Sequence, residues 1–276
     1  MQDLIVIRGA GDLATGLIQK FHRAGFRVLA LETEQPLAIR RSVALCSAVY
    51  QGHMQVEDIR CQRIDSPGDA QGCWAKGEIP LLIDPNCESL PALKPDGLVD
   101  AIIAKKNLGT SLAMAPITIA VGPGFCAGRD VNLVIESMRG HDLGRLIMEG
   151  YASPNTGTPG EIGGKSAERV IHAPRGGKVL HHKEIGDLVE KGQAICSIEG
   201  EAVRAPFTGL LRGLIQEGLT VKKGLKIADI DPRCDVDWRT ISDKARCIGG
   251  AALEAYLFLR TYLESLPNRF VGPFSA

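Results

Sequence analysis

The sequence lacks the features that mark nucleic-acid-binding proteins. Aromatic residues make up only 5% of the chain, and no block of like charges stands out. Lysine plus arginine and aspartate plus glutamate both number 32, so the formal net charge is zero. Proteins that bind nucleic acids or anionic lipid surfaces generally carry an excess or a cluster of positive charge. We therefore expect no nucleic acid among the partners of this chain.

Closely spaced metal ligands and long apolar segments are missing as well. The eight cysteines include no C-x-x-C pair, and zinc sites need ligands clustered at such short spacings, so no metal is expected. The longest apolar stretch, residues 113–121, falls far short of the roughly 20 residues that span a membrane. No signal-peptide pattern opens the chain. These absences predict a soluble cytoplasmic protein with reduced thiols and no membrane association.

The first half of the chain has the pattern of an α/β domain. Residues 4–7 form an apolar run that ends at the glycine turn Gly9-Ala10-Gly11. Apolar residues then recur at helical spacing, and a second apolar run follows at 28–31. A strand, a glycine turn, a helix and a strand within about 30 residues make one βαβ unit. Further strands are expected at 81–83, 98–104, 117–121 and 131–135, and helices at 42–50 and 69–75. The pattern predicts an α/β, Rossmann-like domain over residues 1–150.

The second half contains an internal repeat at an offset of 32 residues. The offset pairs Ala173-Pro174 with Ala205-Pro206, and Lys191-Gly192 with Lys223-Gly224. Such matches indicate the same backbone used twice. We predict a β-rich module over 170–232 that resembles the barrel-sandwich hybrid of biotinyl and lipoyl carriers. Its central hairpin, 196–203, has no lysine to modify, which favours a scaffold or interaction role. A loop over 151–169 would precede the module, and a terminal helix at 242–266 would lie within the segment 233–276.

The glycine turn is the first candidate ligand site. Gly9 and Gly11 match the first two positions of G-x-G-x-x-G, and Ala14 occupies the third. Such a turn directs backbone N–H groups and a helix N-terminus at a phosphate. Glu32 lies where an acid that binds ribose is expected. Asp12 is awkward, because its carboxylate repels a phosphate, and a tight turn without a ligand stays open as the alternative.

Two basic pairs could supply positive charge to such a ligand. Arg40 and Arg41 suit a polyanion through bidentate hydrogen bonds, although their spacing alone favours a solvated pair on a helix. Lys105, Lys106 and Asn107 follow a predicted strand, and open α/β sheets bind ligands at the carboxyl ends of their strands. A lysine there could neutralise phosphate or transfer a proton.

A polar run beginning at Arg139 contains the only histidine that we consider as a candidate catalytic residue. His141, beside Asp142, could transfer protons, and Arg129 with Arg139 could hold an anion. A single histidine is more often structural. The polar loop at 153–160 could close over a ligand or simply turn the chain.

Several motifs occur together in one order along the chain. They are Gly9-Ala10-Gly11-Asp12-Leu13-Ala14-Thr15-Gly16, Ile39-Arg40-Arg41, Val99-Asp100-Ala101-Ile102, Ala104-Lys105-Lys106-Asn107, Val121-Gly122-Pro123-Gly124-Phe125, Arg139-Gly140-His141-Asp142-Leu143-Gly144-Arg145, Pro154-Asn155-Thr156-Gly157 and Ser242-Asp243-Lys244-Ala245-Arg246. With these motifs the chain resembles the selenium-dependent molybdenum hydroxylase system proteins of YqeB type, which are distantly similar to the XdhC/CoxI accessory proteins.

The resemblance implies an accessory protein that helps to mature molybdenum hydroxylases. The expected ligand is the molybdenum cofactor (molybdopterin) or a nucleotide, and the expected partner is a hydroxylase client. Delivery of selenium or sulfur would use a thiol, for which Cys126 is the best candidate, although its position favours a structural core thiol. The resemblance supplies no established catalytic residue, and whether the chain is an enzyme stays open.

Two other functions remain open at this point. An NAD(P)-dependent oxidoreductase would bind its cofactor at Gly9 and Gly11 and use His141 as the proton donor. A non-catalytic scaffold would dock a client enzyme through the repeat module. Self-association into a homo-oligomer is left open as well.

Overall fold

A computed structural model describes residues 3–157 and 163–265. It shows a mixed α/β protein with one large sheet, several smaller antiparallel sheets and a C-terminal helix. The first compact unit takes its described residues from 1–34, 45–155 and 241–276, and the second from 35–44 and 156–240. Within the described ranges, no helix is both long and apolar enough to cross a membrane.

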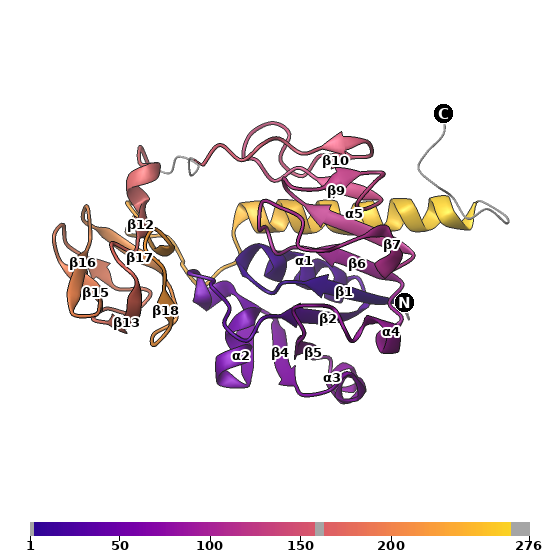
Figure 1. The fold of residues 1–276 in the computed structure, drawn as a ribbon, viewed down its shortest axis with the longest axis horizontal. Helices are drawn as coiled ribbons and strands as arrows, with labels where there is room; N and C mark the ends of the chain where they lie inside the picture. The colour runs from indigo at the N-terminus through magenta and orange to yellow at the C-terminus, as the bar shows by residue number, and fades with distance from the viewer. Residues whose placement is uncertain (1–2, 158–162, 266–276) are drawn as a thin grey trace. The chain divides into compact units, whose positions relative to one another are not determined.

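The first unit is built on a nine-stranded sheet with the order β10-β9-β7-β6-β1-β2-β5-β4-β3 (Figure 1). The seven strands from β9 to β4 in this order are parallel, while β10 and β3 pair antiparallel at the edges. The strands are β1 (Leu4–Arg8), β2 (Arg27–Glu32), β3 (His53–Val56), β4 (Ile59–Ile64), β5 (Ile79–Ile83), β6 (Gly97–Asp100), β7 (Ile117–Val121), β9 (Leu133–Ile135) and β10 (Leu146–Ile147). Every residue of β1, β6 and β7 is buried, as is usual for parallel strands with both faces covered.

Two long helices cover one face of this sheet and run side by side (Figure 1). They are α1 (Asp12–Arg23) and α5 (Asp243–Glu264). They touch at Gly16 and Gly249, where a Cβ on Gly249 would lie 2.5 Å from the Gly16 carbonyl oxygen. Further along, the Phe21 and Tyr256 rings meet edge to face at 5.9 Å. The two helices therefore run parallel and begin at the same edge of the sheet.

The remaining elements of the first unit are short. The helices are α2 (Ala48–Gln51), α3 (Ala70–Ala75) and α4 (Leu90–Leu93), and the 3-10 turns are η2 (Leu45–Ser47), η3 (Pro67–Asp69) and η4 (Leu112–Met114). A separate two-stranded ribbon pairs β8 (Cys126–Ala127) with β11 (Gly150–Tyr151).

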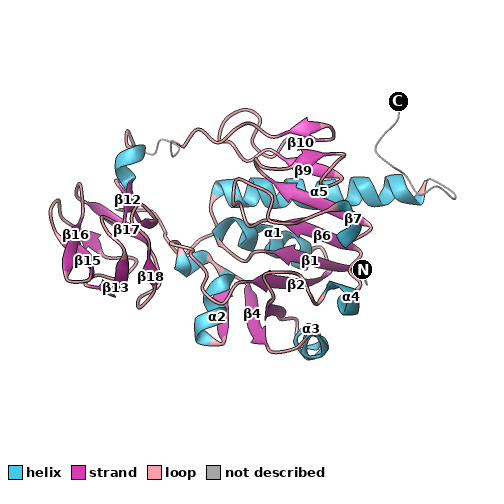
Figure 2. Ribbon diagram, viewed as in Figure 1, coloured by secondary structure: helices cyan, strands magenta, loops and turns pink. Residues whose placement is uncertain are grey.

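The second unit consists mainly of strands and loops (Figure 2). Its two four-stranded sheets have the orders β12-β19-β17-β14 and β16-β15-β13-β18. The strands are β12 (Val170–His172), β13 (Gly177–His181), β14 (Leu188–Val189), β15 (Ala194–Ile198), β16 (Glu201–Arg204), β17 (Gly209–Leu214), β18 (Thr220–Val221) and β19 (Lys226–Asp231), with 3-10 turns η1 (Arg41–Val43) and η5 (Ala167–Arg169). Strands β13, β14 and β15 begin 32 residues before β17, β18 and β19, which is the offset of the sequence repeat.

Two predicted elements of the first half are wrong in extent. The helix expected at 42–50 is two 3-10 turns and the short α2, because Leu45 N–H donates to Thr15 Oγ1 and Cys46 N–H donates to the Ala10 carbonyl instead of to helical acceptors. The strand expected at 98–104 ends at Asp100, whose carboxylate accepts the Ile102 N–H and turns the chain. The β3–β4 hairpin was not predicted.

The units also differ in extent from the predicted segments 1–150, 151–169, 170–232 and 233–276. Residues 35–44 join the second unit, and α5 joins the first.

Candidate functional site

The glycine turn is held rigidly between β1 and α1. Gly9 has φ +97°, and a Cβ there would lie 3.1 Å from the Ile102 Cα atom, so a side chain at this position would be strained and crowded. Its N–H donates to the Leu31 carbonyl at 2.7 Å. Helix α1 follows with Gly11 as its N-cap. The first-turn N–H groups of a helix have no acceptor within the helix, and here no side-chain bond caps them. This arrangement is suited to binding an anion.

Glu32 ends β2 and lies directly against this turn. Its carboxylate accepts the Ala10 N–H and the Thr33 N–H, both at 2.9 Å. Burial raises the pKa of Glu32, although these two bonds oppose the shift. The structure therefore brings Glu32 to the glycine turn, where a ligand hydroxyl bound by Glu32 would lie within reach of Gly9 and Gly11.

The loop after β6 packs on the glycine turn and carries the two lysines. Ile103 and Lys105 both adopt left-handed backbone conformations, with φ +59° and +63°. A β-branched residue rarely does so, and such strain concentrates at functional sites. Lys105 and Lys106 are exposed. Asn107 holds the loop, because its Oδ1 accepts the Gly109 and Thr110 N–H groups, each at 2.8 Å.

A buried charged network that sequence reasoning missed lies under this loop. The Arg8 guanidinium donates to Thr110 Oγ1 and to the Pro85 carbonyl, both at 2.8 Å, and to the Leu108 carbonyl at 3.0 Å. It also lies 3.5 Å from the Asp100 carboxylate. Burial raises the pKa of Asp100. The network fixes the loop to the end of the sheet. The signal was present, since Arg8 and Asp100 are charged residues at the ends of apolar runs.

A second group of charged residues lies where β9 ends and α5 begins, at the same edge of the sheet as the glycine turn. Glu136, which follows β9, accepts the Met138 and Ser153 N–H groups, each at 2.7 Å. Burial opposes its ionisation, but these bonds outweigh burial and lower the pKa of Glu136. Lys244, in the first turn of α5, is half-buried. Burial, and then Arg139, lower the pKa of Lys244.

Lys244 was not predicted as a site residue. The available signal was its place in the run of charges at the start of the terminal helix, Ser242-Asp243-Lys244-Ala245-Arg246.

The other predicted residues lie elsewhere. His141 is exposed and makes no hydrogen bond or ion pair with the described residues, while Arg139 pairs with Asp243 through two 2.7 Å bonds. Cys126 is half-buried in β8, with its Sγ 3.7 Å from the Ala127 carbonyl. Neighbouring Arg129 pairs with Asp130 at 3.0 Å.

The arginine pair lies in the second unit and makes contacts there. Arg41 donates to the Leu214 carbonyl at 2.7 Å and to Gln216 Oε1 at 3.1 Å, and Arg40 donates to the Thr240 carbonyl at 3.4 Å. Ligand binding by these arginines stays a prediction.

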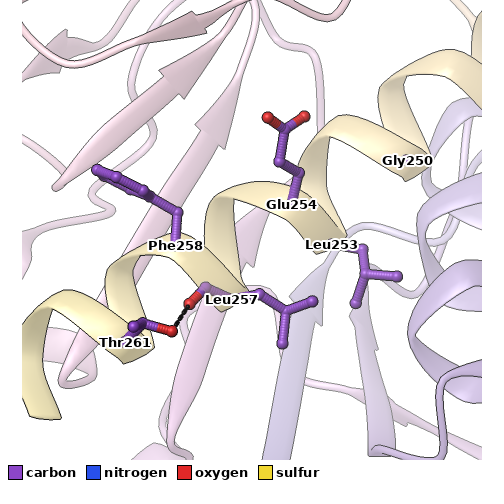
Figure 3. Close-up of a pocket in the computed structure, with 6 residues that line it drawn as sticks. All are labelled: Gly250, Leu253, Glu254, Leu257, Phe258 and Thr261. Atoms are coloured by element: carbon purple, nitrogen blue, oxygen red, sulfur yellow. Dashed lines mark hydrogen bonds between the residues drawn. The ribbon is translucent and has the colours of Figure 1, made fainter.

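A groove elsewhere on the first unit offers no comparable chemistry. A shallow apolar groove follows the outer face of α5, and Glu254 is the one ionisable residue of its lining (Figure 3). The others are Gly250, Leu253, Leu257, Phe258 and Thr261. Within residues 3–157 and 163–265, no three His, Cys, Asp or Glu side chains are grouped to hold a metal ion.

Comparison with known proteins gives one relative by sequence. The chain is 49% identical over 257 residues to the uncharacterized protein YqeB of Escherichia coli (strain K12). The match covers 93% of this chain and 48% of that protein, so the chain spans about half the length of this curated relative. No protein-family model matches the sequence.

Solved structures show only weak likeness. The ectoine utilization protein EutE (DoeB) of Ruegeria pomeroyi has a TM-score of 0.26 at 10% identity, covering 83% of this chain and 85% of that chain. A succinylglutamate desuccinylase of Silicibacter sp. TM1040 has a TM-score of 0.27 at 10% identity, covering 83% and 86%. An aspartoacylase family protein of Mesorhizobium loti has a TM-score of 0.26 at 9% identity, covering 84% and 86%.

Proposed function

We propose that this chain binds a phosphate-bearing ligand, a nucleotide or molybdopterin, at the glycine turn of a Rossmann-like first unit. The observation that carries the proposal is the contact between Gly9 and Ile102, which places the loop after β6 against the glycine turn. Strand order in the sheet reverses at β1, because β2 lies on one side of it and β6 on the other. Ligands of open α/β sheets bind at such a switch point, beyond the carboxyl ends of the strands. Here the glycine turn follows β1 and the lysine loop follows β6.

The chemistry at this edge suits a phosphate ester. The α1 N-terminus supplies N–H groups and the positive end of the helix dipole. Lys105 and Lys106 supply charge from a loop whose backbone the Arg8 network fixes. Glu32 supplies an acceptor for a ribose hydroxyl or a pterin N–H group. We further propose that the ligand is handled during maturation of selenium-dependent molybdenum hydroxylases. The motifs shared with YqeB-type proteins support this.

The second unit is proposed to dock the client enzyme as a barrel-sandwich-hybrid-like module. Its two sheets and its repeat support that architecture. Its hairpin between β15 and β16 carries Glu199, Gly200 and Glu201, not a lysine for a prosthetic arm.

Ligand binding can be tested by isothermal titration with ADP, GDP, NAD and molybdopterin. We expect one of these ligands to bind, and expect Lys105→Met/Lys106→Met to weaken its binding at least about tenfold, because hydrogen bonds to charged groups contribute about 1.5–3 kcal/mol. Both lysines are exposed, so the fold should be unaffected. A double variant of exposed lysines outside the site, Lys76→Met/Lys94→Met, controls for net charge. Absence of binding to all four ligands would contradict the proposal.

An NAD-dependent oxidoreductase is the second candidate, and the position of Glu32 favours it. An acid at the end of β2 is the residue that binds the ribose of NAD in dehydrogenases. NAD should then raise the melting temperature of the chain. If NAD gives no thermal shift while another phosphate-bearing ligand does, this second candidate is removed.

A further inference from the structure

Lys244 is brought to the glycine turn by the packing of two helices. Helix α5 begins at Asp243 and α1 begins at Asp12, and the two run parallel with Gly16 against Ala245. This contact is close because Gly16 has no side chain. Lys244, one residue before Ala245, therefore lies at the same edge of the sheet as the first turn of α1.

The position is unfavourable for a lysine. A cation in the first turn of a helix faces the positive end of the helix dipole. Burial and the nearby Arg139 guanidinium add to this cost, and both lower the pKa of Lys244. Asp12, Glu136 and Asp243 act in the opposite direction. These four residues are the charged groups that act on Lys244.

The described residues do not provide Lys244 with a bonded partner. No hydrogen bond or ion pair joins it to them. Asp243 is held by Arg139 through two 2.7 Å bonds, and Glu136 is occupied by the Met138 and Ser153 N–H groups. Lys244 is therefore a half-buried ammonium without a bonded partner, at the edge of the sheet where an anion is expected. A bound anionic ligand would supply that partner.

We propose that the Lys244 ammonium binds the phosphate group of the ligand held at the glycine turn. This inference rests on the proposed function and names a residue that contacts the ligand. It also accounts for Asp12, whose carboxylate would repel a phosphate at the start of α1. Lys244 places a positive charge beside Asp12 and offsets that repulsion. The anion would in turn stabilise the ammonium against burial, the helix dipole and Arg139.

Titration with ADP at pH 7 tests the assignment on the full chain. We expect Lys244→Met to weaken ADP binding at least about tenfold, on the scale of a charge-assisted bond. Lys244→Arg, which keeps the charge, should restore most of the affinity, and Lys76→Met should leave it unchanged. If Lys244 stabilised the fold, Lys244→Met would lower the melting temperature of the chain. The proposal predicts an unchanged or higher melting temperature, because an unpartnered half-buried charge is removed.

Reductive labelling with pyridoxal 5′-phosphate gives a readout independent of nucleotide affinity. The phosphate of the probe would occupy the glycine turn, and its aldehyde would condense with the Lys244 amine, forming a C=N bond and releasing water. Borohydride then adds hydride to the carbon, the nitrogen gains a proton from solvent, and a stable secondary amine results. Mass spectrometry should show Lys244 labelled faster than Lys76, with protection by ADP.

The outcomes separate the two proposals. If ADP binds and Lys244→Met binds it equally well, the assignment of Lys244 is overturned and the glycine-turn site stands. Equal labelling of Lys244 and Lys76 overturns it in the same way. If the wild-type chain binds none of ADP, GDP, NAD, molybdopterin and pyridoxal 5′-phosphate, the glycine-turn site and the role of Lys244 fall together. If one of the other three ligands binds in place of ADP, the Lys244 variants are titrated with that ligand.

Discussion

At the scale of single residues, buried charges at the ends of strands define the candidate site. Arg8 ends β1 and Asp100 ends β6, and both are almost fully buried. Buried charged groups need hydrogen-bond partners. Here Arg8 donates to Thr110 Oγ1, which in turn donates to Asp100, and these bonds fix a strained loop against the glycine turn. The loop geometry therefore depends on residues that do not themselves face a ligand.

Asp58, at the tip of the β3–β4 hairpin, provides a pH-dependent test of the fold. Arg23 on α1 donates two 2.8 Å bonds to its carboxylate and is the main cause that lowers the pKa of Asp58 from about 3.8 to about 2. Since the folded pKa lies below the unfolded value, the stabilisation is complete above pH 4 and is lost as pH falls towards 2.

Asp58→Asn should therefore lower the free energy of unfolding at pH 7 and have less effect near pH 2. The pair is half-exposed, so we expect a loss of at most about 1 kcal/mol. Urea unfolding at pH 7, 4 and 2.5 measures the difference. Asp65→Asn is the control, because Asp65 is exposed and lies 4.0 Å from its arginine. An equal loss for Asp58→Asn at every pH would contradict the assigned pKa.

At the scale of elements, the parallel strands and the repeat could be predicted because their signals are local. Strands β1, β2 and β7 are continuous apolar runs, and the repeat shows as matched glycines at one offset. The β3–β4 hairpin gave no such signal. It lies at the sheet edge with exposed and buried residues mixed, including His53, Gln55 and Arg60.

The candidate site was predictable in part for the same reason. Gly9, Gly11 and Glu32 belong to one local βαβ pattern. Lys244 reaches the site through helix packing between segments more than 200 residues apart, and no local pattern reports such a contact.

Adjacent glycines in α5 offer a matched test of that helix packing. A Cβ on Gly249 would lie 2.5 Å from the Gly16 carbonyl oxygen, whereas a Cβ on Gly250 meets nothing within 4 Å. Gly249→Ala should cost about 1–3 kcal/mol through overpacking. Gly250→Ala, in the lining of the outer groove (Figure 3), should instead stabilise by up to about 1 kcal/mol through helix propensity. Urea unfolding of both variants measures these changes, and a shift of the same sign in both would contradict the packing.

At the scale of the whole molecule, the chain enters the second unit twice. Residues 35–44 belong to that unit although they follow β2 in sequence. The Leu214 N–H donates to the Ile39 carbonyl at 2.7 Å, and Arg41 donates to the Leu214 carbonyl at the same distance. Gly213 permits this approach, since a Cβ there would lie 3.1 Å from the Ile39 oxygen. The early segment thus binds β17 as an integral part of the second unit.

This arrangement gives Arg41 a structural function that can be separated from ligand binding. Arg41→Ala removes its bonds to Leu214 and Gln216 and should destabilise the second unit by about 1–3 kcal/mol, because the Leu214 carbonyl loses its side-chain donor. Hydrogen exchange followed by mass spectrometry should show faster exchange in β17 and β19 and unchanged exchange in β1 and β2. The control is Arg175→Ala, at an exposed arginine of the same unit. If Arg41→Ala instead weakens ADP binding while exchange in β17 stays at the wild-type rate, Arg41 serves the ligand, as its sequence pattern allowed, and the structural function assigned to it is wrong.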